Sequence, residues 1–167
     1  MSANFKLQID LVPEPLWNKN LRDEKWGLGR TRWDKLRKQI LEANGPACAI
    51  CGIVKEPQGH EVWEYDEQVK PCVARLVKIE IICKPCHMIM HWSRTNQFSP
   101  PETLAFLREH FCAVNKCQQS DFDAHVKQSN AIYQTRSRKE WKIDWGEFVG
   151  AMAAAVVARE ARGTRER

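Results

Sequence analysis

The sequence lacks any long hydrophobic run, any internal repeat and any low-complexity tract. The Ala/Val-rich stretch Ala151–Ala158 is too short to cross a bilayer, and Met1–Lys6 does not resemble a signal peptide. A strong excess of one charge is also missing, because the net charge is +5 and the isoelectric point is near 8.9. We therefore expect a cytoplasmic protein without a membrane partner, whose mildly basic balance permits a nucleic-acid partner without requiring one.

A disulfide framework is not expected either. The chain has seven cysteines, and four of them form two Cys-x-x-Cys pairs, which favours reduced thiolates inside the cell. With 167 residues, of which 28% are charged and 43% hydrophobic, the composition is that of one soluble domain. The informative chemistry is therefore expected around the paired cysteines.

The two Cys-x-x-Cys pairs are Cys48 with Cys51 and Cys83 with Cys86. Each pair presents two thiolates from one tight turn, and two pairs complete the tetrahedral set that a structural Zn²⁺ ion requires. Such a closed site organises the chain and does no catalysis. The alternative is four buried free thiols that pack as small apolar side chains, but the spacing favours zinc.

Three histidines accompany these cysteines. His87 and His91 are four residues apart, so that on a helix they project from one face, while His60 lies on an expected strand beside Glu61. The three imidazoles predict a site for a second divalent metal (Mg²⁺, Mn²⁺, Ni²⁺ or Zn²⁺). A metal held by three imidazoles keeps coordination positions open and would polarise a phosphoryl oxygen. The alternative is that His87 only starts a helix and His91 faces solvent.

The hydrophobic periodicity predicts an α+β fold. Residues 1–46 are expected to supply a strand and a helix, residues 47–95 the metal module, and residues 96–167 a helical region of the same domain. The expected strands are 5–11, 61–67, 74–82 and 141–145, with the first paired to the last. The expected helices begin at Thr31, near Pro85, at Ser99, at Ser120 with Asp123 in a capping box, and at Glu147.

The order of these motifs resembles that of the HNH endonucleases, especially their zinc-knuckle subgroup. The matching residues are Cys48-x-x-Cys51, His60-Glu61-Val62-Trp63-Glu64-Tyr65-Asp66 and Cys83-x-x-Cys86-His87-x-x-x-His91. The flanks are similar to a small bacterial and phage HNH family, at Leu11-Val12-Pro13, Val114-Asn115, Arg136-Ser137-Arg138 and Trp141-x-Ile143-Asp144-Trp145. The resemblance implies a ββα-metal fold and metal-dependent hydrolysis of DNA phosphodiester bonds.

The resemblance also implies that His60, His87 and His91 bind the catalytic metal and that Glu61 activates water. Glu61 stands where the family has a general-base histidine, and a carboxylate is normally the weaker base at neutral pH. Lys78 stands near the position of the family's middle asparagine. The alternative function is therefore a catalytically inactive HNH-like module that binds nucleic acid or inhibits a protein partner.

A basic stripe late in the chain is the candidate contact to nucleic-acid phosphates. It consists of Arg136, Arg138 and Lys139, although a plain solvated face explains these charges equally well. A second set of histidines and cysteines could in principle bind another zinc ion: His110, Cys112, Cys117 and His125. This interpretation is the less favoured one, because the spacing of the four residues is irregular.

Overall fold

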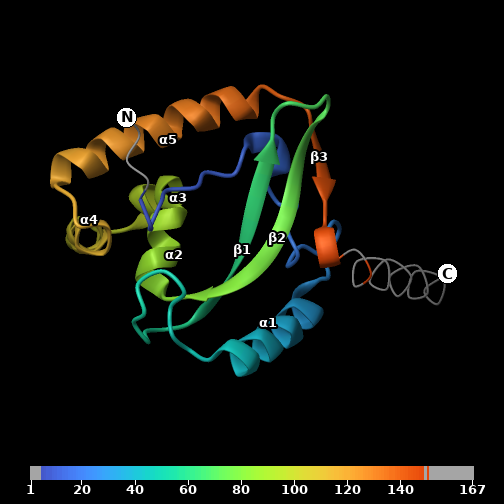
Figure 1. Ribbon diagram of the computed structural model, residues 1–167, viewed down its shortest axis with the longest axis horizontal. Helices are drawn as coiled ribbons and strands as arrows, with labels where there is room; N and C mark the ends of the chain where they lie inside the picture. Colours follow the sequence, from blue (N-terminus) through green and yellow to red (C-terminus); the bar gives the residue numbers. More distant parts are fainter. Residues whose placement is uncertain (1–4, 149, 151–167) are drawn as a thin grey trace.

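The computed structural model describes residues 5–148 and 150, which form a mixed α+β fold (Figure 1). A long helix precedes an antiparallel hairpin, and four helices and a third strand follow it. In chain order the elements are η1 (Glu14–Leu16), α1 (Arg30–Asn44), β1 (Gln58–Asp66), β2 (Cys72–Ile82), α2 (Lys84–Met90), α3 (Trp92–Phe98), α4 (Pro101–Asn115), α5 (Gln119–Ser137), β3 (Trp141–Asp144) and η2 (Gly146–Phe148).

The three strands form one sheet in the order β1-β2-β3. β1 and β2 are antiparallel, as the sequence predicts, with an irregularity between Val62 and Trp63, whereas β3 runs parallel to β2. Because successive side chains of a strand point to opposite faces, Ala74 and Leu76 are buried while Arg75 is exposed. One face of the hairpin is thus covered and the other is partly open to solvent.

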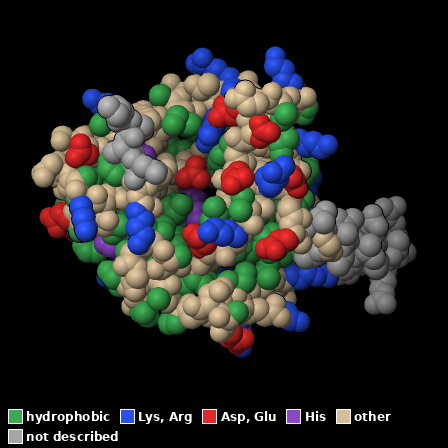
Figure 2. Space-filling view, in the orientation of Figure 1, with side chains coloured by type: hydrophobic (Ala, Val, Ile, Leu, Met, Phe, Trp, Pro, Cys, Tyr) green, Lys and Arg blue, Asp and Glu red, His purple; other side chains and the backbone are tan. Residues whose placement is uncertain are grey.

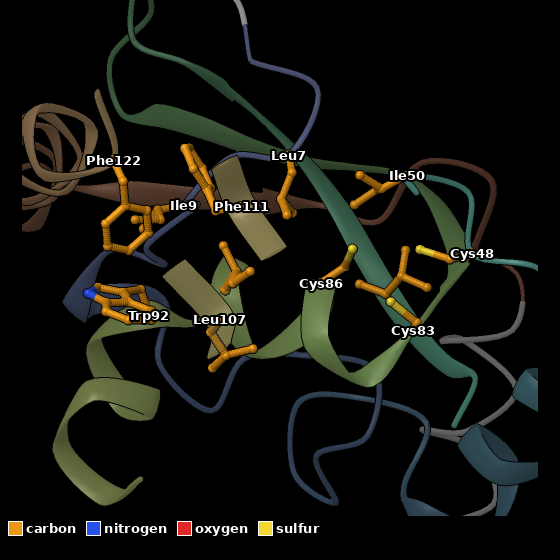
Figure 3. Close-up of a cluster of buried hydrophobic side chains, with 12 residues drawn as sticks. Leu7, Ile9, Cys48, Ile50, Cys83, Cys86, Trp92, Leu107, Phe111 and Phe122 are labelled. Atoms are coloured by element: carbon orange, nitrogen blue, oxygen red, sulfur yellow. The ribbon is translucent and has the colours of Figure 1, made fainter. Parts of the chain in front are cut away.

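Two hydrophobic clusters hold the helices and the hairpin together. In the larger one, α2, α4, α5 and the N-terminal segment meet, and the rings of Phe111 and Phe122 lie edge to face with centroids 5.0 Å apart (Figure 3). Cys83 and Cys86 lie at one end of this cluster. The smaller cluster packs α1 and the loop before it on the hairpin, through Leu21, Leu28, Trp33, Leu76 and Ile79.

The expected strand at residues 5–11 is wrong. This segment lies beside α4 and α5, whose side chains bind its backbone: Asn115 both accepts from and donates to Leu7, and His125 Nε2 accepts the Ile9 N–H at 2.9 Å. Its alternating apolar residues are buried against helices. The alternation of apolar and polar residues therefore reflects an extended segment that pairs with no other strand. The expected pairing of residues 141–145 with the N-terminus is therefore also wrong, since β3 pairs with β2.

Two helices begin at different residues from those expected. α1 begins at Arg30 rather than Thr31, after Gly29, which takes a φ of 80° that favours glycine. Ser99 ends α3, and Pro100 is the N-cap of α4. The helix expected near Pro85 is confirmed as α2.

The N-cap of α5 lies two residues before the expected one. Its capping box consists of Gln118 and Asp121, each side chain bound to the other residue's backbone N–H, instead of Ser120 and Asp123. An Ala-rich helix was expected from Glu147. Apart from the stretch that overlaps η2, it lies almost entirely outside the described residues. No helix in the described part of the chain has the length and apolar character needed to span a membrane.

Candidate metal centres

The four paired cysteines converge on one point, with their Sγ atoms all within 4.8 Å of one another. Cys48 and Cys51 come from a tight turn in which Gly52 N–H bonds to the Cys48 carbonyl at 2.8 Å. Cys83 is the N-cap of α2, and Cys86 lies in its first turn. This four-cysteine group can hold a structural zinc ion, as the sequence predicts, and it joins the turn to the junction between β2 and α2.

The protonation of these thiols depends on their surroundings. Burial opposes the ionisation of Cys48, but hydrogen bonds from the backbone of Cys51, Cys83 and Ile50 lower its pKa to about 7. Burial raises the pKa of Cys83 to about 11. Burial also raises the pKa of Cys86, and the hydrogen bond with Cys83 and the repulsion between neighbouring thiolates act in the same direction. Four sulfurs so close together therefore favour a cation that removes this repulsion.

A residue outside the cysteine pairs contacts this group. His110 on α4 places Nε2 3.3 Å from Cys86 Sγ, and its ring stacks on Phe106 with centroids 6.2 Å apart. The ammonium of Lys55 lies over the Phe106 ring, 5.3 Å from its centroid. The helix α4 is thereby coupled to the cysteines, and the sequence alone offered no indication of this role for His110.

The three histidines form a second group, whose ligand nitrogens also lie within 4.8 Å of one another. The ring centroid of His60 is 5.3 Å from those of His87 and His91, which are 4.7 Å apart. Figure 2 shows histidine at the bottom of a hollow on this face, with acidic side chains near its rim. The structure thus brings all three imidazoles together, and the alternative in which His91 points to solvent does not hold.

The backbone explains why the three rings meet. His87 and His91 are one helical turn apart, and the His91 N–H bonds to the His87 carbonyl at 3.1 Å. His60 projects from β1 toward them and is only 6% exposed. Burial lowers the pKa of His60 to about 3 and that of His87 to about 4, with smaller contributions from the neighbouring imidazoles. Burial, with the nearby charge of Arg94, also lowers the pKa of His91. All three shifts favour the neutral imidazole, which is the form that binds a metal.

Glu61 is not part of the histidine group. Since neighbouring residues of a strand point to opposite faces, its side chain leaves the face of β1 opposite to that of His60. One carboxylate oxygen accepts the Leu21 N–H at 2.7 Å and the other accepts Trp63 Nε1–H at 3.1 Å. Burial raises the pKa of Glu61 to about 7 despite these two donors, which brings its basicity close to that of an ordinary imidazole.

The remaining expected site residues have partners of their own. Lys78 pairs with Glu80 on the same strand at 2.5 Å. Arg136 and Lys139 both bind the carboxylate of Glu67, at 2.9 Å and 2.5 Å. Arg138, the other residue of the expected phosphate-binding stripe, is exposed. Within residues 5–148 and 150, no third metal-binding group forms from His110, Cys112, Cys117 and His125.

Gln58 is a site residue that the sequence analysis did not identify. Its side-chain oxygen Oε1 makes a short contact with Nδ1 of His87. The signal was present in the sequence, because Gln58 precedes His60 by two residues and therefore shares its face of β1.

Comparisons with known proteins yield no relative for this chain. It matches no protein-family model, no curated protein and no solved structure. Its function must therefore be argued from the two groups of ligands and their surroundings.

Proposed function

We propose that this protein is a metal-dependent endonuclease of the HNH type that hydrolyses DNA phosphodiester bonds. The observation that carries this proposal is the convergence of His60, His87 and His91 beside a group of four cysteines that can hold zinc. A hairpin followed directly by a helix supplies the three imidazoles, which is the order of elements in the ββα-metal fold that the motifs resemble.

The donor set fits a divalent cation. Three neutral imidazoles on one side leave further positions open to oxygen ligands, as in catalytic rather than structural sites. A divalent cation bound there would polarise a phosphoryl oxygen and stabilise the leaving oxygen. The chain's own part is to hold the rings: β1 positions His60, α2 positions His87 and His91, and the cysteines fix the start of α2.

Glu61 is the proposed base that takes a proton from water. Its carboxylate is held by Leu21 and Trp63 on the face of β1 opposite to His60, so the base role requires that the carboxylate turn toward the histidines and exchange a donor for water when substrate is bound.

Plasmid cleavage by the purified protein tests the proposal. We expect supercoiled DNA to be nicked in the presence of Mn²⁺, Ni²⁺ or Mg²⁺ by the wild type and not by His91→Ala, because that change removes one of three metal ligands. Gln97→Ala, an exposed position on the neighbouring helix α3, serves as the matched control and should cleave like the wild type. Equal residual nicking by the wild type and His91→Ala would refute the proposal.

A catalytically inactive module that binds nucleic acid or a protein is the second candidate. Two observations favour it: both oxygens of Glu61 already have donors, and Arg136 and Lys139 pair with Glu67 instead of pointing freely to solvent. The two functions are separated by the metal content after purification and by DNA affinity at two salt concentrations. One tightly held zinc, no second metal and no salt-dependent binding would support the protein-binding role.

A further inference from the structure

The contact between Gln58 and His87 determines which nitrogen of His87 is available to a ligand. Gln58 lies on β1, on the same face as His60, and its Oε1 atom meets Nδ1 of His87. An amide oxygen only accepts hydrogen bonds, so the Nδ1 atom must carry the proton. In a neutral imidazole with a proton on Nδ1, the lone pair is on Nε2.

We infer that Gln58 is a positioning residue that fixes His87 in the Nδ1–H tautomer and turns its Nε2 lone pair toward His60 and His91. This inference rests on the proposed metal role of His87. The spacing of the cysteines and histidines by itself gives no reason to expect a role for Gln58 at this site.

The surroundings of His87 explain why such a residue is needed. The backbone of α2 sets the position of His87, since its N–H bonds to the Cys83 carbonyl at 3.0 Å, but the backbone leaves the ring free to rotate. The ring stands 4.7 Å from that of His91 and 5.3 Å from that of His60. A contact from β1 to Nδ1 therefore fixes a rotation that the helix alone does not.

The identity of the side chain has a chemical consequence. Histidines that bind metals commonly donate their second N–H to a carboxylate, which makes the imidazole more basic. The amide of Gln58 orients the ring without adding a negative charge. Replacing Gln58 with glutamate should therefore keep the tautomer and strengthen metal binding, whereas leucine, which has no acceptor, should do neither.

The test uses the full chain, loaded with zinc at the cysteines and free of metal at the histidines. Long-range ¹H–¹⁵N correlation spectra at pH 7.5 report which ring nitrogen of His87 carries the proton, with the signals assigned through His87→Gln. We expect the Nδ1–H tautomer in the wild type and in Gln58→Glu, and the Nε2–H tautomer in Gln58→Leu. An Nε2–H tautomer in the wild type would mean that the amide is oriented with its NH₂ toward the ring, and would overturn the inference.

Titration with Co²⁺, followed by its visible absorption, provides the second measurement. We expect Gln58→Leu to weaken Co²⁺ binding at the histidines by about 10- to 100-fold, and Gln58→Glu to bind at least as tightly as the wild type. Equal affinity in all three proteins would contradict the inference. Because neither readout requires DNA cleavage, a wild type with the Nδ1–H tautomer that fails to cut DNA would refute the nuclease and leave the role of Gln58 standing.

Discussion

Nε2 of His110 lies 3.3 Å from Sγ of Cys86, although the two residues belong to different helices and are 24 positions apart. A ring N–H that donates to a thiolate stabilises its negative charge, and four thiolates on one ion need such compensation. The stack of His110 on Phe106 keeps the ring in place. The surroundings of the four-cysteine group thus extend to α4.

Replacing His110 should weaken zinc retention without removing any ligand. For His110→Phe, which keeps an aromatic ring beside Phe106 but loses the donor, we expect zinc transfer to a colorimetric chelator to be faster by about tenfold. His110→Gln, whose amide still donates, is the matched control and should stay closer to the wild type. Identical transfer rates in all three proteins would show that the contact with Cys86 has no effect on the metal.

Glu61 should also act as a structural tie between the hairpin and the loop before α1. Its carboxylate is the acceptor for the Leu21 N–H, and Leu21 is fully buried in the smaller hydrophobic cluster. Glu61→Ala removes the acceptor and leaves a buried donor unpaired, which costs about 1–3 kcal/mol, whereas Glu61→Gln retains one oxygen. We expect hydrogen exchange at the Leu21 amide to accelerate strongly in Glu61→Ala and less in Glu61→Gln. Unchanged protection in Glu61→Ala would exclude this role.

The Glu67 carboxylate should make the stability depend on pH. The hydrogen bond from Lys139, together with Arg136, lowers the pKa of Glu67 from its ordinary value of 4.5. A carboxylate with a lowered pKa stabilises the fold above the pKa that it has in the unfolded chain, and this contribution disappears as the pH falls through the folded-state pKa. Since the group is partly exposed, the effect should be at most about 1 kcal/mol.

Thermal unfolding at several pH values checks this expectation. Glu67→Gln should unfold at a lower temperature than the wild type at pH 7. The difference should disappear as the pH falls through the lowered folded-state pKa of Glu67, below which both side chains are neutral. Glu140→Gln, a nearby exposed position, should match the wild type throughout this range. A difference between Glu67→Gln and the wild type that stays constant as the pH is lowered would assign the effect to packing rather than charge.

The members of the cysteine group and of the histidine group were predictable from the sequence because their geometry is local. A Cys-x-x-Cys turn brings two sulfurs together wherever it folds, and His87 and His91 share a helix face at a spacing of four. The hairpin connects the two cysteine pairs along the chain, so few arrangements of the pairs other than one shared site remained. The mixed α+β fold and the hairpin followed by a helix were predictable for the same reason.

The errors arose where a pattern depends on partners distant in sequence. Residues 5–11 alternate like a strand, but Asn115 and His125, more than 100 residues away, bind their backbone in place of a neighbouring strand. Arg136 and Lys139 are a basic pair in the sequence, and only the fold places Glu67 against both. Gln58 was missed because glutamine is not itself a usual metal ligand. His110 was assigned to a different candidate zinc set, and only the fold places its ring beside Cys86.

The composition of the histidine group predicts which metals it prefers. Mg²⁺ takes oxygen ligands in octahedral geometry and retains several waters, whereas imidazole nitrogens suit Zn²⁺, Ni²⁺ and other late transition metals. His60, His87 and His91 form the group without a carboxylate among its members. We therefore expect calorimetric titrations of the zinc-loaded protein to show Ni²⁺ binding more tightly than Mn²⁺, and Mn²⁺ more tightly than Mg²⁺.

Exchanging one ring for a carboxylate should shift this preference. His91→Asp replaces a nitrogen donor with oxygen and adds a negative charge, so Ni²⁺ affinity should fall while Mg²⁺ and Mn²⁺ lose less or gain. His91→Ala separates the two effects, because it removes the nitrogen without supplying an oxygen and should weaken every metal. If Mg²⁺ bound the wild type as tightly as Ni²⁺, or if His91→Ala left Ni²⁺ affinity unchanged, the three imidazoles would not be acting together as one binding site.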